Sequence, residues 1–255
     1  MTMSEVFDGL ATIYNQQRPR YPHAVYALLE QLVDPTPPLK ILDAGAGPGV
    51  VLEDLLPTFG PLAEYTAVDI SADMVATGAE RLPEATWVHS PVEPDLEQRR
   101  DLALITVGQA AHWFDRPRFY AAAIQALRPG GVLAIIQNNR DYTRGGFAQA
   151  WEELAEAYSP GYTRTYRDFP YAQELAEAFA PADSDHGVYQ AEWTLTRSPE
   201  DTRGRALSSS KMQAALAAAG DTFEAALDAA IAANTEDGEV SHTMITEVYW
   251  VRKAA

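Results

Sequence analysis

Three glycines at alternate positions carry the strongest chemical signal in the 255-residue sequence. Gly45, Gly47 and Gly49 follow the apolar stretch at residues 39–42. Glycine is required where a backbone turns with positive φ, or where a ligand touches the main chain with no Cβ between them. Asp69 lies 20 residues beyond Gly49, at the end of the next apolar stretch, where a carboxylate can accept both hydroxyls of a ribose. These residues predict a nucleoside-containing ligand; a tight turn with no ligand is the alternative.

Two details indicate which nucleoside the loop suits. The dinucleotide fingerprint G-x-G-x-x-G/A needs Gly or Ala at position 50, where this chain has Val50. Asp43 stands two residues before Gly45, and its carboxylate would oppose a pyrophosphate but suits an ammonium group. S-adenosylmethionine has a ribose and an amino-acid part but no phosphate. We therefore predict S-adenosylmethionine as cofactor and S-adenosylhomocysteine as product, and a nicotinamide-dependent oxidoreductase stays open as the alternative.

The elements that must position this loop follow from the apolar periodicity. We expect two helices over residues 4–33, then strands at 39–42, 65–70, 85–89, 102–107 and 132–137. Helices are expected at 50–56, at 71–82 with Ser71 as N-cap, and from a cap at Asp115 to a stop at 129–131. Short apolar strands that alternate with helices predict an α/β fold with a Rossmann-like, doubly wound, mostly parallel sheet.

The pattern changes after residue 139. Eight aromatic residues fall between 142 and 171, followed by a strand at 188–196, helices at about 200–233 and a strand at 241–252. We expect a helical, aromatic-rich insertion after the fifth strand, with most of its aromatics in its own core. The chain would form a single domain over 1–255, with N-terminal helices (1–37), a cofactor-binding core (38–139), a helical insertion or lid (140–186), and closing strands and helices (187–255).

Composition excludes several function classes. The chain has 19 Lys and Arg against 36 Asp and Glu, a net charge of −17, which disfavours nucleic acid and anionic membranes as partners. The absence of cysteine excludes disulfides, thiolate metal sites and a cysteine nucleophile. The five histidines lack metal-ligand spacing, so we expect no metal. Without a secretory signal or an apolar run of ~18 residues, a cytoplasmic location is expected; monomer and homodimer both stay open.

The motifs together resemble the class I S-adenosylmethionine-dependent methyltransferases. Residues 41–49, ILDAGAGPG, resemble the first motif of that family, and residues 67–71, AVDIS, resemble its second. Residues 7–22, the segment QAAHWFD at 109–115 and LRPGG at 127–131 resemble the subgroup that includes trans-aconitate methyltransferase-like proteins. The resemblance implies the fold and the methyl-transfer chemistry, with a small-molecule acceptor for which a carboxylate is one candidate class. A non-catalytic protein that binds S-adenosylmethionine is a further alternative.

The resemblance also implies which residues hold the cofactor. The loop would approach its methionine part, Asp69 its ribose, Ile70 and Met74 its adenine, and Gly108 its amino group. Pro91 departs from the family's third motif, which leaves a backbone contact from Val92 beside Glu93. The implied cofactor-binding set is Tyr14, Arg18, Asp43, Gly45, Ala46, Gly47, Gly49, Asp69, Ile70, Met74, Val92, Glu93 and Gly108.

Residues on the acceptor side are implied less sharply. His112 follows the fourth strand, where it could act as a base, orient the substrate or form part of the wall. Tyr21, Trp113 and Arg140 are the candidate substrate contacts, although core packing is an alternative for Trp113. Arg18, Arg140 and Arg144 fall in segments expected near the mouth of the pocket, and arginine pairs with carboxylates through two hydrogen bonds.

Overall fold

A central mixed sheet organises the molecule. A computed structural model describes residues 19–165, 168–182 and 184–254. The strands are β1 (Leu39–Ala44), β2 (Ala63–Asp69), β3 (Thr86–His89), β4 (Leu102–Gly108), β5 (Leu127–Arg140), β6 (Asp185–Arg197), β7 (Thr235–Glu236) and β8 (Glu239–Arg252). Their order is β3-β2-β1-β4-β5-β8-β6, with β7 beside β8. The neighbours from β3 to β5 are parallel, whereas β8 is antiparallel to both β5 and β6. The predicted mostly parallel, Rossmann-like sheet is confirmed.

Helices cover both faces of this sheet. Ile41 of β1 faces one apolar core and its neighbour Leu42 faces the other, because successive strand residues point to opposite sides. The first core includes residues of α2 (His23–Leu32) and α3 (Leu52–Phe59), and the second includes residues of α5 (Val92–Leu96), α6 (Arg116–Ala126) and α8 (Tyr171–Phe179). The helix α4 (Ala72–Arg81) contacts β2 and β3. Both faces are therefore buried, as a doubly wound fold requires.

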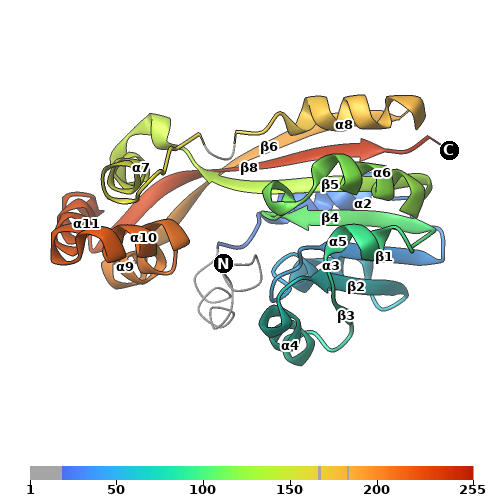
Figure 1. The fold of residues 1–255 in the computed structure, drawn as a ribbon, viewed down its shortest axis with the longest axis horizontal. Coiled ribbons are helices and arrows are strands. Elements are labelled where there is room, and N and C mark those ends of the chain that lie inside the picture. The colour runs from blue at the N-terminus through green and yellow to red at the C-terminus, as the bar shows by residue number, and fades with distance from the viewer. Residues whose placement is uncertain (1–18, 166–167, 183, 255) are drawn as a thin grey trace.

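A separate helical cluster stands at one end of the molecule (Figure 1). It is formed by α7 (Gly146–Tyr158), α9 (Pro199–Leu207), α10 (Ser210–Ala219) and α11 (Asp221–Ala233), which share a third apolar core. The long strands β5, β6 and β8 reach toward this cluster, whereas α8 lies beside α6 at the other end (Figure 1). Short 3-10 turns occur at η2 (Ala111–Trp113), η3 (Tyr142–Arg144) and η4 (Ala180–Ala182). Segment 140–186 is thus divided between two places rather than packed as one unit.

The predicted helix starts agree with the observed caps. Ser71 accepts a hydrogen bond from the Met74 amide, and Asp115 accepts one from the Arg118 amide at the start of α6. The predicted stop at residues 129–131 is wrong, because α6 ends at Ala126 and these residues already belong to β5. The Gly130 amide donates to the carbonyl oxygens of Lys253 and Ala254, which joins the start of β5 to the residues that follow β8. The predicted first helix lies outside the described residues.

Six aromatics of the 142–171 segment pack into apolar cores, but they do not form a core of the segment's own as predicted. Phe147 and Trp151 are buried in the core of the helical cluster, and Tyr158 and Tyr162 pack against it. Tyr171 is buried in the second core of the sheet, with Phe169 packed against that core. No helix in the described residues is long and apolar enough to cross a membrane.

Candidate active site

The glycine loop is anchored to the end of β2 by its own backbone. The amides of Gly45 and Ala46 donate to the Val68 carbonyl oxygen at 2.8 and 3.1 Å. The Gly47 amide donates to Asp69 Oδ2 at 2.8 Å. The loop and the carboxylate at the end of β2 therefore hold each other in place.

The three glycines of the loop are required for different reasons. All three have positive φ: 67° at Gly45, 55° at Gly47 and 90° at Gly49. A Cβ on Gly49 would lie 2.7 Å from Leu82 Cδ1 and 3.1 Å from the Trp87 ring, so this glycine permits packing between loop, α4 and β3. A Cβ on Gly47 would meet no atom of the described residues within 4 Å. Gly47 thus faces open space, and Gly49, predicted to bind the cofactor, is a packing position that lines neither cavity described below.

Asp69 is a buried carboxylate with capacity for further hydrogen bonds. It is 9% exposed, and its Oδ1 accepts the Ser71 amide at 2.8 Å while Oδ2 accepts Gly47. Burial raises the pKa of this carboxyl, and the hydrogen bonds from Ser71 and Gly47 oppose the shift. An ionised carboxylate has about four lone-pair sites, so Asp69 can accept a hydrogen bond beyond those from the backbone amides. A ribose hydroxyl is a donor of the kind that this carboxylate can bind.

The first cavity opens at the carboxyl ends of β1, β2 and β4, and eight predicted cofactor residues line it. They are Gly45, Gly47, Asp69, Ile70, Met74, Val92, Glu93 and Gly108. Pro91, Gln109, Ala110, Trp113 and Phe114 complete the wall. Trp113, predicted as a substrate contact, therefore lies on the same cavity as the ribose-type carboxylate. Among the described residues, Asp69 and Glu93 are the two acidic side chains in an otherwise largely apolar lining, which suits a planar aromatic base beside a sugar.

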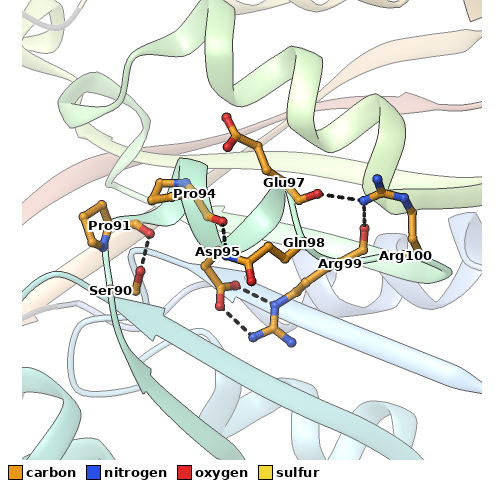
Figure 2. Close-up of polar contacts among 8 residues, drawn as sticks. All are labelled: Ser90, Pro91, Pro94, Asp95, Glu97, Gln98, Arg99 and Arg100. Carbon is orange, nitrogen blue, oxygen red and sulfur yellow. Dashed lines mark hydrogen bonds and ion pairs between the residues drawn. The ribbon is translucent and has the colours of Figure 1, made fainter.

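The segment after β3, residues 91–93, forms part of the wall of this cavity. Figure 2 shows the Ser90 hydroxyl donating to the Pro91 carbonyl oxygen at 2.9 Å, and Asp95 paired with Arg99. These contacts fix α5 locally while Pro91, Val92 and Glu93 face the cavity. Glu93 Oε1 also accepts the Asp115 amide at 2.9 Å, which connects α5 to the turn that carries Trp113.

A second cavity shares its inner edge with the first. Gly45, Gly47, Gly108 and Gln109 line both. The other lining residues of the second cavity are Pro19, Tyr21, Ala46, Pro48, Val50, Val51, Asn138 and Arg205. The predicted residues Tyr21 and Ala46 are therefore found here, whereas no described residue of the 140–186 segment lines either cavity.

Several predicted site residues are elsewhere. Asp43 is fully buried under the loop, where the Thr106 hydroxyl donates to its Oδ1 at 2.7 Å, and neither cavity reaches it. His112 lines neither cavity, and its ring centroid lies 5.0 Å from that of Trp113. Arg140 bonds Glu152 Oε1 at 2.9 and 3.2 Å and covers the Trp151 ring. Tyr14 and Arg18 lie outside the described residues.

Sequence reasoning missed Gln109, Asn138 and Arg205. Gln109 has a φ of 57°, directly after β4, and its Nε2 donates to the Asn138 carbonyl oxygen at 2.7 Å. Its position at a strand's carboxyl end was the available signal, since ligands bind there in open α/β sheets. Arg205 comes from the helical cluster and has no local motif. No cluster of three or more potential metal ligands occurs among the described residues.

The comparison with known proteins decides among the alternatives. A family model described as a methyltransferase domain matches residues 41–131. A trans-aconitate 2-methyltransferase of Variovorax paradoxus is 32% identical over 159 residues, covering 59% of this chain and 61% of that protein. The chain therefore carries a methyltransferase domain with the class I methyltransferase fold. A methyltransferase domain agrees with the predicted donor S-adenosylmethionine, and the oxidoreductase alternative is not supported.

Two further similarities agree with the methyltransferase assignment. An uncharacterized methyltransferase of Mycobacterium tuberculosis is 27% identical over 199 residues, which cover 78% of this chain and 74% of that protein. The solved structure of a putative type II methyltransferase from Anaeromyxobacter dehalogenans superposes with a TM-score of 0.67 at 21% identity, covering 93% of this chain and 97% of that one. The latter similarity concerns the fold of the methyltransferase.

Proposed function

We propose that the methyltransferase methylates a small organic carboxylate, with the cofactor in the first cavity and the acceptor in the second. The observation that carries this proposal is the edge that the two cavities share, at Gly45, Gly47, Gly108 and Gln109. Reactants held on the two sides of that edge can meet in line. Positioning of this kind, at about 3–3.5 Å between reacting atoms, supplies a large part of the rate of a two-substrate reaction.

The residues of the first cavity fit the cofactor. Asp69 has lone pairs for the ribose hydroxyls, while Ile70, Met74 and Val92 offer apolar surface to an adenine ring. The open space at the missing Cβ of Gly47 lets a ligand approach the main chain. When bound, S-adenosylmethionine supplies a methyl group on a positively charged sulfur.

The protein's own work is then to orient the acceptor and exclude water. A carboxylate is already ionised near neutral pH, because its ordinary pKa is about 4, so no protein base is needed to activate it. We therefore propose that His112 supports Trp113 rather than removing a proton. Of the predicted substrate contacts, we propose that Tyr21 touches the acceptor, because it lines the second cavity together with Gly108. Trp113 lines the first cavity, so we propose that it contacts the cofactor instead.

The relatives and the charge support this acceptor class. The trans-aconitate 2-methyltransferases that resemble the chain are named for trans-aconitate, a small carboxylate. A net charge of −17 repels polyanionic macromolecules such as nucleic acids. A small acid that is desolvated in a cavity escapes much of that repulsion when a local arginine is present.

Methyl transfer from deuterium-labelled S-adenosylmethionine to a panel of small molecules tests the proposal. The panel contains trans-aconitate and other mono-, di- and tricarboxylates, with amines and phenols of similar size as matched competitors. We expect a labelled methyl ester of a carboxylate in the mass spectrum. Labelled products confined to amines, phenols or macromolecules of a cell extract would contradict the carboxylate assignment while leaving the methyltransferase assignment in place.

A further inference from the structure

Arg205 connects the helical cluster to the active site. It lies on α9, which begins after Ser198, whose Oγ accepts the Asp201 amide at 3.0 Å. Thr202 and Ala206 are buried on this helix, and Arg205 lies beside them, half-buried. The stem of an arginine in this place can pack on apolar surface while its guanidinium reaches past the edge of the cluster.

Among the described residues, Arg205 is the one charged side chain that lines the second cavity. The remaining lining is glycine, proline, alanine and valine, with the polar groups of Tyr21, Gln109 and Asn138. A guanidinium has five donors in a planar fork, which matches the two oxygens of a carboxylate. Arg205 therefore brings a positively charged, five-donor group to the described lining of the second cavity.

Arg205 and Asn138 also line a polar crevice that extends away from the glycine loop. The crevice includes Arg140 and Arg164, which pair with Glu152 and Glu156. Nearby, burial and the positive charges of Arg140, Arg205 and Arg197 lower the pKa of His242 to about 4. The crevice nevertheless carries both signs of charge, because Asp141, Glu152, Asp168 and Glu247 also line it.

We propose that Arg205 is a specificity-determining residue that binds a carboxylate of the acceptor other than the one that is methylated. The inference rests on the proposed function. Arg205 lines the second cavity and the crevice but not the cofactor cavity, and it is not among the four residues of the edge that the two cavities share. An acceptor that spans from this arginine to that edge has at least two anionic groups. The helical cluster thus selects the substrate, while the glycine loop and Asp69 hold the donor.

The test separates acceptor binding from cofactor binding. Arg205→Gln and Arg205→Lys are compared with Arg203→Gln, a matched control on the same helix whose guanidinium pairs with Asp228 at 2.7 Å. Calorimetry first measures the affinity for S-adenosylhomocysteine without acceptor. Steady-state kinetics then use trans-aconitate as probe, or the carboxylate turned over fastest in the panel described above. Thermal melts report whether each variant is folded.

We expect Arg205→Gln to keep its affinity for S-adenosylhomocysteine within about twofold and to raise the KM for the acceptor tenfold or more. Arg205→Lys should recover part of this loss, because it restores the charge without the fork. Arg203→Gln should behave as the wild type. An unchanged acceptor KM in Arg205→Gln overturns the proposal, and so does a matching loss of S-adenosylhomocysteine affinity, which would place the arginine on the cofactor's own carboxylate. Wild-type protein that methylates no carboxylate would instead overturn the proposed function itself.

Discussion

The cavity at the glycine loop and the crevice that contains Arg140 and Arg164 are held together by different kinds of contact. At the loop, backbone amides of Gly45, Ala46 and Gly47 bond the end of β2, and the cavity wall comes from residues next to strand ends. On the other side, long charged side chains pair across different elements, as Arg140 does with Glu152. The first kind of site is fixed by local chain geometry, and the second depends on tertiary packing. Substitutions should therefore affect cofactor binding at the loop and mainly stability at the ion pairs.

The largest effect is expected at Arg140. Its guanidinium is 20% exposed and Glu152 is 6% exposed, so Arg140→Met leaves a carboxylate buried without its cation. We expect the free energy of unfolding to fall by about 3 kcal/mol, as measured when one partner of a buried pair is removed. Urea unfolding gives the stability, and calorimetry should show unchanged affinity for S-adenosylhomocysteine. A stable Arg140→Met variant that has lost cofactor affinity would contradict the division between the two regions.

Asp69 should show the reverse pattern. Removing its carboxylate in Asp69→Ala takes away the acceptor for the ribose hydroxyls as well as for the Gly47 amide. We expect binding of S-adenosylhomocysteine to weaken by roughly 1.5–3 kcal/mol, the value of a hydrogen bond to a charged group. Glu93→Gln is the control in the same cavity, since an amide oxygen can still accept the Asp115 amide. Calorimetry that shows equal affinities for Asp69→Ala and the wild type would remove Asp69 from the cofactor site.

Gly47 and Gly49 make a matched pair within one loop. Gly47→Ala adds a methyl group to space that no protein atom occupies within 4 Å, so we expect a folded protein with at least tenfold weaker cofactor binding. Its unfavourable φ of 55° costs about 1–2 kcal/mol of stability. Gly49→Ala instead pushes against Leu82 and Trp87, and should lose more stability. Circular dichroism melts and calorimetry on both variants measure the difference. Normal cofactor affinity in Gly47→Ala would mean that the loop is only a turn.

The smallest effect concerns Asp43, which lies under the loop. Burial raises the pKa of its carboxyl from 3.8 to about 7, with the charge of Asp69 adding to the shift and the Thr106 hydrogen bond opposing it. Because the folded state then holds a proton that the unfolded state releases, stability from this group falls as the pH rises from about 4 to about 7. Asp43→Asn should therefore stabilise the cofactor-free protein by about 1 kcal/mol at pH 8 and less at pH 5. Urea titrations that show the same difference at both pH values would contradict the shifted pKa.

The difference between the regions also explains how far the sequence alone could be interpreted. The positions of Gly45, Gly47 and Asp69 could be predicted because each residue ends a strand or follows it closely. The carboxyl ends of neighbouring parallel strands lie close together in space. Gly49 has the same spacing, but its role depends on Leu82 and Trp87, which no local pattern brings to it. Arg205 was missed because α9 reaches the second cavity only through the packing of the helical cluster. Arg140 was expected at the mouth of the pocket. Its guanidinium instead donates a hydrogen bond to Glu152, which lies twelve residues away in sequence.

A crystal structure of the protein with S-adenosylhomocysteine and trans-aconitate would show whether donor and acceptor occupy the two adjoining cavities. We expect ribose hydroxyls at about 2.6–3.2 Å from the Asp69 carboxylate, adenine against Ile70, Met74 and Val92, and the acid in the cavity that Tyr21 and Arg205 line. A ribose that does not contact Asp69, or an acid bound outside the second cavity, would contradict this expectation.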